Sequence, residues 1–112
     1  MLTLNQFKFN SDEEKSLISI EVFVQIINFN NSSIQIIITD SEGNFKKLAA
    51  GFPGNDPVTL LGIQGEPEDL NERFAAVFSR KLKKPVFVSY NLPQNLDPKT
   101  VNRIQKKIAD LL

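Results

Sequence analysis

Hydrophobic and polar residues alternate in two long segments among the first forty residues of the chain. The segment 17–27 (LISIEVFVQII) has a β-branched residue at every second position: Ile18, Ile20, Val22, Val24 and Ile26. A period of two in β-branched residues predicts a half-buried β-strand. The alternation resumes in 34–40 (IQIIITD), after the asparagines and serines of 28–33 (NFNNSS), which tolerate tight turns. Together these segments predict a long antiparallel hairpin.

Shorter segments with a similar pattern precede and follow the hairpin. Residues 2–9 (LTLNQFKF) form a weaker alternating segment that can pair with it, and 44–52 (NFKKLAAGF) predicts a shorter strand. Residues 51–67 contain four of the five glycines and three of the six prolines, so most of this segment is predicted to be loop. Within it, 58–62 (VTLLG) is expected to pair briefly as an edge strand.

Two segments of the C-terminal half have the spacing of amphipathic helices. Pro67 suits a first helical turn, and apolar residues then recur at helical spacing with charges on the opposite side. The predicted stripe consists of Leu70, Phe74, Val77, Phe78 and Leu82. Pro85 ends this helix, and 86–92 (VFVSYNL) returns to strand. Asp97 as N-cap and Pro98 at the first helical position begin a second helix. Its predicted buried stripe is Val101, Ile104, Ile108 and Leu111.

The order of these elements is strands, helix, strand, helix. It predicts an α+β fold, with a single mainly antiparallel β-sheet of about six strands and two helices packed on one face. A chain of 112 residues fits one domain, and no linker or internal repeat interrupts it. Residues 1–112 are therefore expected to form a single domain.

Composition excludes several classes of function. Thirteen basic residues balance thirteen acidic ones, so no net charge attracts the chain to nucleic acid or to a membrane surface. The absence of cysteine and histidine removes disulfides, thiolate chemistry, the usual zinc sites and the commonest general base. No segment resembles a secretory signal or approaches the roughly 18 apolar residues of a membrane span. A cytoplasmic or nuclear protein without a cofactor is therefore expected.

Ser89 and Tyr90 lie side by side in the most strand-like segment of the chain. A nucleophilic serine needs a base, which without histidine would be a lysine or a carboxylate, and no G-x-S-x-G motif surrounds Ser89. Strand alternation instead predicts two packed faces: Val86, Val88, Tyr90 and Leu92 on one, and Phe87, Ser89 and Asn91 on the other. The glycine-rich loop lacks the lysine of a phosphate-binding loop, because Glu66 and Pro67 follow Gly65. No catalytic, metal or cofactor site is predicted.

The predicted strands are apolar on both faces, whereas two helices can cover only one. The face that carries Ile18 to Ile26 is the richer and is expected to lie under the helices. The opposite face presents Phe23, Ile27, Ile37 and Phe87. Contiguous exposed apolar patches are uncommon on monomers and usually mark interaction surfaces. This second face is therefore the predicted partner interface, expected to pack on the sheet of a structural relative.

A basic cluster ends the first helix and continues beyond it: Arg80, Lys81, Lys83 and Lys84. Arg103, Lys106 and Lys107 repeat the pattern on the second helix. Two interpretations stay open. The cluster is either a docking patch for an acidic protein surface, or a set of solvated charges that compensate the helix macrodipole.

The C-terminal half resembles the proteasome assembly chaperone 4 family, which helps to build the 20S core particle. That family has a lysine-containing helix end, a strand close to VFVSYNL and a C-terminal helix containing NRI. The matching positions here are Val86, Phe87, Val88, Ser89, Tyr90, Asn91, Leu92, Asn102, Arg103 and Ile104. The LLG of 60–62, ahead of the first helix, is a further match.

The resemblance implies a non-enzymatic protein with an antiparallel sheet and two helices. It implies pairing with a proteasome assembly chaperone 3-like subunit through packed sheet faces. The heterodimer would support formation of the ring of α-type subunits and leave before the particle matures, without nucleic acid or membrane as a partner. An alternative from another class is a small peptide- or metabolite-binding module that uses the 51–66 loop and the open sheet face.

Overall fold

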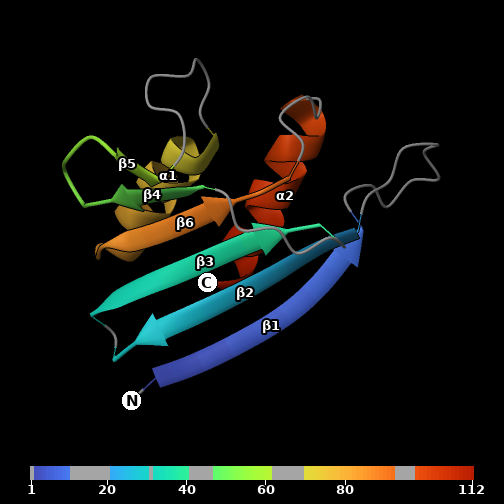
Figure 1. Cartoon of the computed structure of the whole chain (residues 1–112), viewed down its shortest axis with the longest axis horizontal. Coiled ribbons are helices and arrows are strands. Elements are labelled where there is room, and N and C mark those ends of the chain that lie inside the picture. Colours follow the sequence, from blue (N-terminus) through green and yellow to red (C-terminus); the bar gives the residue numbers. More distant parts are fainter. Residues whose placement is uncertain (1, 11–20, 31, 41–46, 62–69, 93–97) are drawn as a thin grey trace.

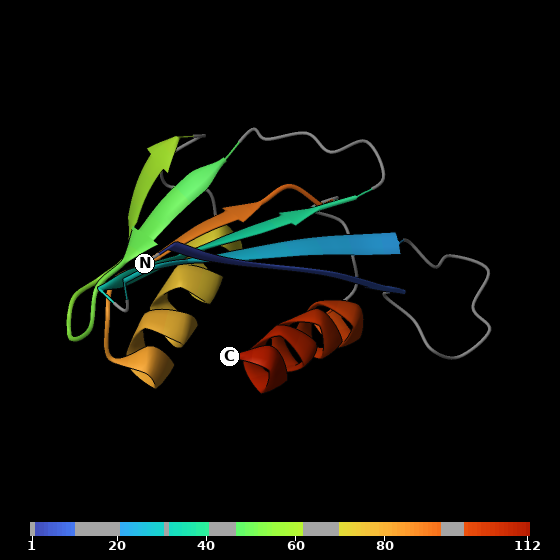
Figure 2. The same cartoon turned by 90° about the horizontal axis from the view of Figure 1, so that it is seen from below.

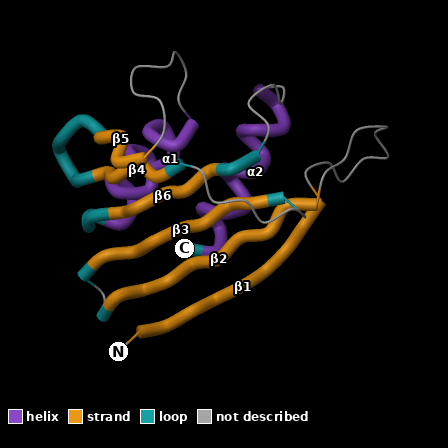
Figure 3. Tube along the Cα trace, viewed as in Figure 1, coloured by secondary structure: helices purple, strands orange, loops and turns teal. Residues whose placement is uncertain are grey.

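The structure is a computed structural model that describes residues 2–10, 21–30, 32–40, 47–61, 70–92 and 98–112. The elements, in chain order, are β1 (Leu2–Asn10), β2 (Glu21–Phe29), β3 (Ser33–Thr39), β4 (Leu48–Gly51), β5 (Val58–Leu61), α1 (Leu70–Leu82), β6 (Val86–Tyr90) and α2 (Pro98–Leu111). The strands form one sheet in the order β1-β2-β3-β6-β4-β5, as Figures 1 and 3 show. The predicted α+β class and the count of about six strands are confirmed.

The strand that is last in the chain order, β6, lies near the middle of the sheet. It pairs in parallel with β3 and antiparallel with β4, whereas the other three pairings within the described residues are antiparallel. The sheet is therefore mixed, although mainly antiparallel as predicted. The parallel pair follows from the crossover between β3 and β6, which contains β4, β5 and α1.

The predicted hairpin is confirmed as β2 and β3, with Phe29 opposite Ser33 at its closed end. Ser32 donates its backbone N–H to the carbonyl of Phe29 at 2.9 Å. Asn30 adopts a left-handed conformation with φ of 53°, which asparagine tolerates better than most residues. The N-terminal segment pairs along β2 as β1, also as predicted, while the predicted strand residues 17–20 lie outside the described ranges.

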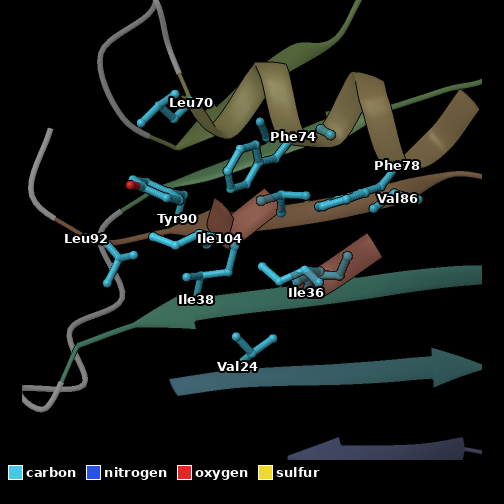
Figure 4. Close-up of a cluster of buried hydrophobic side chains, with 14 of the residues drawn as sticks. Val24, Ile36, Ile38, Leu70, Phe74, Phe78, Val86, Tyr90, Leu92 and Ile104 are labelled. Atoms are coloured by element: carbon cyan, nitrogen blue, oxygen red, sulfur yellow. The ribbon is translucent and has the colours of Figure 1, made fainter. Parts of the chain in front are cut away.

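Both helices cover the same face of the sheet (Figure 2). The buried positions beneath them are Val22, Val24 and Ile26 of β2 and Ile34, Ile36 and Ile38 of β3, while the residues between these positions are half-buried on the other face. Figure 4 shows Phe74 and Phe78 of α1 packed with Ile104 of α2 above the strands. Full burial of each such side chain stabilises the folded state by roughly 1.5–3 kcal/mol. The predicted division of the sheet into a covered and an uncovered face is present in the fold.

One predicted core position of α2 is wrong. Val101, Ile104 and Ile108 are buried as expected, but Leu111 is 54% exposed. The last turn is tightened, because Leu112 donates its N–H to the carbonyl of Ala109. Leu112 rather than Leu111 packs against the core as a result. In the stripe predicted for α1, the other helix, Val77 and Leu82 are partly buried and the remaining members are fully buried.

Candidate functional site: the open face of the sheet

The four residues predicted for a partner interface share the face of the sheet that the helices leave uncovered. Phe23 and Ile27 come from β2, Ile37 from β3 and Phe87 from β6, and all four are half-buried. Their strand neighbours point the other way into the core, where Val24, for example, is 1% exposed. We call the surface around Phe23, Ile27, Ile37 and Phe87 the open face.

Strand register places two of these side chains, Ile27 and Phe87, in one row across the sheet. Ile27 lies opposite Gln35, Gln35 opposite Phe87, and Phe87 opposite Ala50. Ala50 in turn lies opposite Val58 of the edge strand β5, which is 45% exposed. Directly opposed residues point to the same side of a sheet, so the row is apolar at four of its five positions. The row therefore runs from β2 to β5, although Ala50 within it is only 2% exposed.

Sequence reasoning missed the part of the open face that β5 contributes. Val58 was expected only in a brief edge strand, and its alignment with Phe87 depends on the position of β4 between β5 and β6. The exposed fractions of Phe29 (39%) and Phe52 (38%) also identify further large apolar residues at the surface. The β-branched and aromatic residues of these segments were the feature of the sequence that could have indicated this apolar surface.

Ser89 lacks the surroundings of a nucleophile. Its side chain is buried, and its Oγ accepts a hydrogen bond at 2.8 Å from Nδ2 of Asn91. The backbone N–H of Asn91 extends the parallel pairing by donating to the carbonyl of Ile38 at 2.9 Å. Oδ1 of Asn91 accepts the N–H of Lys47, just before β4, at 3.2 Å. Ser89 and Asn91 thus connect the ends of β3 and β6 to the start of β4.

Tyr90 is a core residue of the motif formed by the matching positions in 86–92 and 102–104. Its ring makes an edge-to-face contact with Phe74, with centroids 5.3 Å apart, and both residues appear in Figure 4. Its backbone N–H donates at 2.6 Å to Oδ1 of Asn71, a buried residue of α1. Burial raises the pKa of the Tyr90 phenol above its usual range, so the hydroxyl stays neutral. Tyr90 therefore attaches β6 to α1 through both its ring and its backbone.

The remaining motif residues also have structural positions. Val86, Val88 and Leu92 are buried on the helix side of the sheet. On α2, Ile104 is fully buried, Arg103 is half-buried, and Oδ1 of Asn102 accepts a hydrogen bond at 2.6 Å from Arg73 of α1. The motif thus joins the central strand to both helices, with Phe87 as its member on the open face.

The basic cluster lies at the end of α1. Arg80, Lys81 and Lys83 are exposed and Lys84 is half-buried. Lys83 adopts a left-handed conformation with φ of 56°, and its N–H donates to the carbonyl of Ser79 at 2.8 Å. This bond is the usual way in which a left-handed residue ends a helix. Nζ of Lys81 donates to the carbonyl of Ala109 at 2.6 Å and so connects the two helices.

Two other kinds of site find no support among the residues that the structure describes. No three acidic, cysteine or histidine side chains gather where they could hold a metal ion. No helix in the same ranges is long and apolar enough to cross a bilayer. Residues 52–56 of the β4–β5 connection are exposed, and the part of the 51–66 loop beyond Leu61 lies outside the described ranges.

Comparisons with known proteins agree with this arrangement. No curated protein matches the chain at a significant level. Among solved structures, it is similar to a chain in a structure described as a "Novel Chaperone Complex for Yeast 20S Proteasome Assembly", with a TM-score of 0.60 and 16% identity. The alignment covers 96% of this chain and 94% of the yeast chain, which shows a shared fold. The family model described as "Proteasome assembly chaperone 4" matches residues 21–92, from β2 through β6. The chain therefore belongs to the proteasome assembly chaperone 4 family, which is a family of assembly chaperones and not of enzymes.

Proposed function

We propose that this chain chaperones assembly of the 20S proteasome core as one half of a heterodimer. Its partner is a proteasome assembly chaperone 3-like subunit, and the pair supports formation of the ring of α-type subunits and leaves before the particle matures. The observation that carries the proposal is the open face, with Phe23, Ile27, Ile37 and Phe87 half-exposed opposite the helices. The proposed compartment is the cytoplasm or the nucleus, where a cysteine-free chain loses no stabilising disulfide.

The shape of the open face favours another sheet as its occupant. Sheets pack face to face at a separation of about 10 Å, with side chains of the two inner faces interdigitating. The row from Ile27 to Val58 crosses five strands, so a partner sheet would meet apolar side chains across much of its width. An interface of ordinary size buries about 800 Å² on each partner. The similar yeast chain comes from a structure described as a chaperone complex, which supports a paired state.

The proposed mechanism is templating. Association of several α-type subunits into a closed ring loses translational and rotational freedom at every step. A chaperone pair that contacts the subunits in their correct neighbourhood lowers that cost and disfavours other arrangements. Because the pair must leave, its contact with the ring is expected to be weaker than the contact between its own two sheets.

The test introduces charge into the open face. Phe23→Glu and, separately, Phe87→Glu are expected to reduce capture of the chaperone 3-like subunit at least about tenfold, because a carboxylate would be desolvated at the interface. Both positions point away from the core, so circular dichroism should show an intact fold. The central variant Phe87→Glu is the stricter one, since its row neighbours Gln35 and Ala50 are uncharged, whereas Lys8 lies opposite Phe23 in the strand register.

Asn55→Glu is the matched control, because it adds the same charge to the exposed β4–β5 loop. It should leave pairing unchanged. Normal capture of the partner by both phenylalanine variants would contradict the proposal. Recovery of the tagged wild-type chain alone, with a bound peptide or metabolite whose retention Asn55→Glu weakens, would favour a small-ligand module instead.

A further inference from the structure

Charge is segregated in this chain although its net charge is zero. Residues 70–92 and 98–112, which contain both helices and β6, hold nine basic side chains and two acidic ones, Glu72 and Asp110. This part therefore has a formal excess of seven positive charges, balanced by an acidic excess elsewhere in the chain. If the charged residues were distributed evenly along the chain, basic and acidic side chains would be mixed in every segment. The helical layer is instead strongly basic.

Two hydrogen bonds fix the basic residues of α1 next to those of α2. Arg73 donates to Asn102 and, eight residues later, Lys81 donates to the carbonyl of Ala109. The helices consequently run in parallel with their C-terminal ends together, on the face of the sheet seen in Figure 2. Both acceptors are neutral, so these contacts hold the cations in place without cancelling their charge. Lys106 follows Asn102 by about one helical turn, which places both on the same side of α2, and it is exposed.

Compensation of the helix macrodipole explains only part of this charge. The effect falls off within the last turn of a helix. Arg80 and Lys81 do lie in the last turn of α1. The last turn of α2, however, contains no basic residue, and Arg103 and Lys106 precede it. The basic residues of α2 therefore need another explanation.

We infer that the C-terminal end of α1, the two lysines that follow it and the middle of α2 form a second docking surface, which recognises an acidic protein surface. This basic helical face consists of Arg80, Lys81, Lys83, Lys84, Arg103 and Lys106. Among these, Arg80, Lys83, Lys84 and Lys106 form no ion pair within the described residues. The inference rests on the proposed function, in which the acidic surface belongs to a proteasome α-type subunit. The open face then holds the chaperone partner while the opposite side of the molecule meets the ring.

Other anionic partners fit this face less well. Apart from Leu111 at the end of α2, the apolar stripes of α1 and α2 are buried against the sheet, so neither helix has a continuous apolar side free to enter a lipid interface. The exposed residues of both helices include no aromatic side chain on which a nucleic-acid base could stack. A protein surface requires neither feature, because complementary charge steers association and sets orientation.

The test combines Lys83→Glu, Lys84→Glu and Lys106→Glu in the full chain, used alone and paired with the chaperone 3-like subunit. Binding to purified α-type subunits is measured between about 50 and 500 mM salt, across which the Debye length falls from roughly 14 Å to roughly 4 Å. Wild-type binding should weaken as salt rises. The triple variant should bind about tenfold or more weakly at low salt and show a flatter salt dependence, while pairing stays normal. Lys99→Glu, at the other end of α2, is the matched control and should bind like the wild type.

The outcomes separate this inference from the proposed pairing. Normal pairing with salt-independent or unchanged binding of α-type subunits by the triple variant would overturn the inference alone. Lysine-dependent binding of α-type subunits by a chain that fails to pair would overturn the heterodimer and leave the inference in place. Tighter lysine-dependent binding to single-stranded RNA, or to vesicles of phosphatidylserine, than to α-type subunits would replace the acidic protein as occupant.

Discussion

At the scale of single residues, Tyr90 combines a well-packed ring with an isolated hydroxyl. The ring contacts Phe74, and the backbone N–H is bonded to Asn71. The phenolic oxygen, however, is buried without a hydrogen-bond partner in the part of the chain that the structure describes. A buried, unpaired hydroxyl costs free energy, whereas its replacement by hydrogen is close to neutral. Tyr90 is thus held by its ring and backbone.

This environment predicts a specific loss of stability in alkali. The unfolded chain ionises Tyr90 near pH 10, while burial keeps the folded phenol protonated at that pH because its pKa is raised. The folded state therefore binds more protons, and the free energy of unfolding should fall as pH rises above about 10. Tyr90→Phe should remove this component and retain or slightly raise stability at neutral pH. Urea unfolding of both proteins at about pH 8 and pH 11 measures the difference.

The chain itself supplies the control for this prediction. It contains one tyrosine and no tryptophan, so an ultraviolet titration reports on Tyr90 without interference. The folded wild type should show no phenolate at the pH where the urea-unfolded chain is half-ionised. Equal titration of folded and unfolded protein would show that the phenol is accessible to solvent and would contradict the structure.

At the scale of elements, the position of α1 over β4 depends on a glycine. A Cβ added to Gly51, the last residue of β4, would lie 2.2 Å from the carbonyl oxygen of Ala75 and 3.0 Å from Oγ of Ser79. The carbonyl belongs to the helix backbone and cannot rotate away. Nearby, the hydroxyl of Thr59 in β5 donates to the carboxylate of Glu72, which attaches the edge strand to the same helix.

Gly51→Ala is expected to destabilise the protein by about 1–3 kcal/mol, because helix and strand must separate to admit the methyl group. Chemical denaturation measures the loss, and hydrogen exchange should show weaker protection in α1 than in β2. Adding Ser79→Ala should not restore stability, since the main clash is with backbone. Gly54→Ala is a useful contrast: its left-handed φ of 81° is disfavoured for alanine, but nothing lies within 4 Å of the added carbon. Equal exchange in α1 for both variants would argue against close approach at Gly51.

Periodicity predicts the elements of this fold better than their arrangement. Alternation in β2 and β3 correctly assigned Phe23 and Ile37 to the uncovered side, because register and side-chain direction follow from the period of two. The insertion of β6 between β3 and β4 is a long-range pairing that local patterns do not encode. The row that reaches Val58 therefore emerged only from the structure. The predicted burial of Leu111 was wrong for a local reason, because the last turn of α2 is tightened.

At the scale of the whole molecule, the two sides of the sheet have opposite chemistry. One side offers apolar side chains from β2 to β5, and the other offers the cations of the basic helical face. The two proposed contacts therefore do not compete for surface. Hydrophobic burial suits a lasting pair, whereas charge suits a contact that steers encounter and is readily broken.

This division predicts that the partner stabilises the chain by mass action. A chaperone 3-like subunit at about a hundredfold over its Kd should add about 2.7 kcal/mol of stability, which raises the thermal midpoint of a domain of this size by roughly 10 °C. Phe87→Glu should lose the shift while its own midpoint stays near that of the wild type. Lys106→Glu should keep the shift. A midpoint that is indifferent to partner concentration would count against pairing in solution.

The place of β6 in the sheet also has a consequence for how the protein is made. A ribosome releases β1 to β5 before β6, yet β6 is the strand that joins β3 to β4. Until residue 90 has emerged, the nascent sheet exists as two pieces with unpaired inner edges, and such edges favour aggregation. A chain interrupted within α1 would consequently leave its first three strands unable to complete the layer. Sensitivity to late truncation is thus built into the topology.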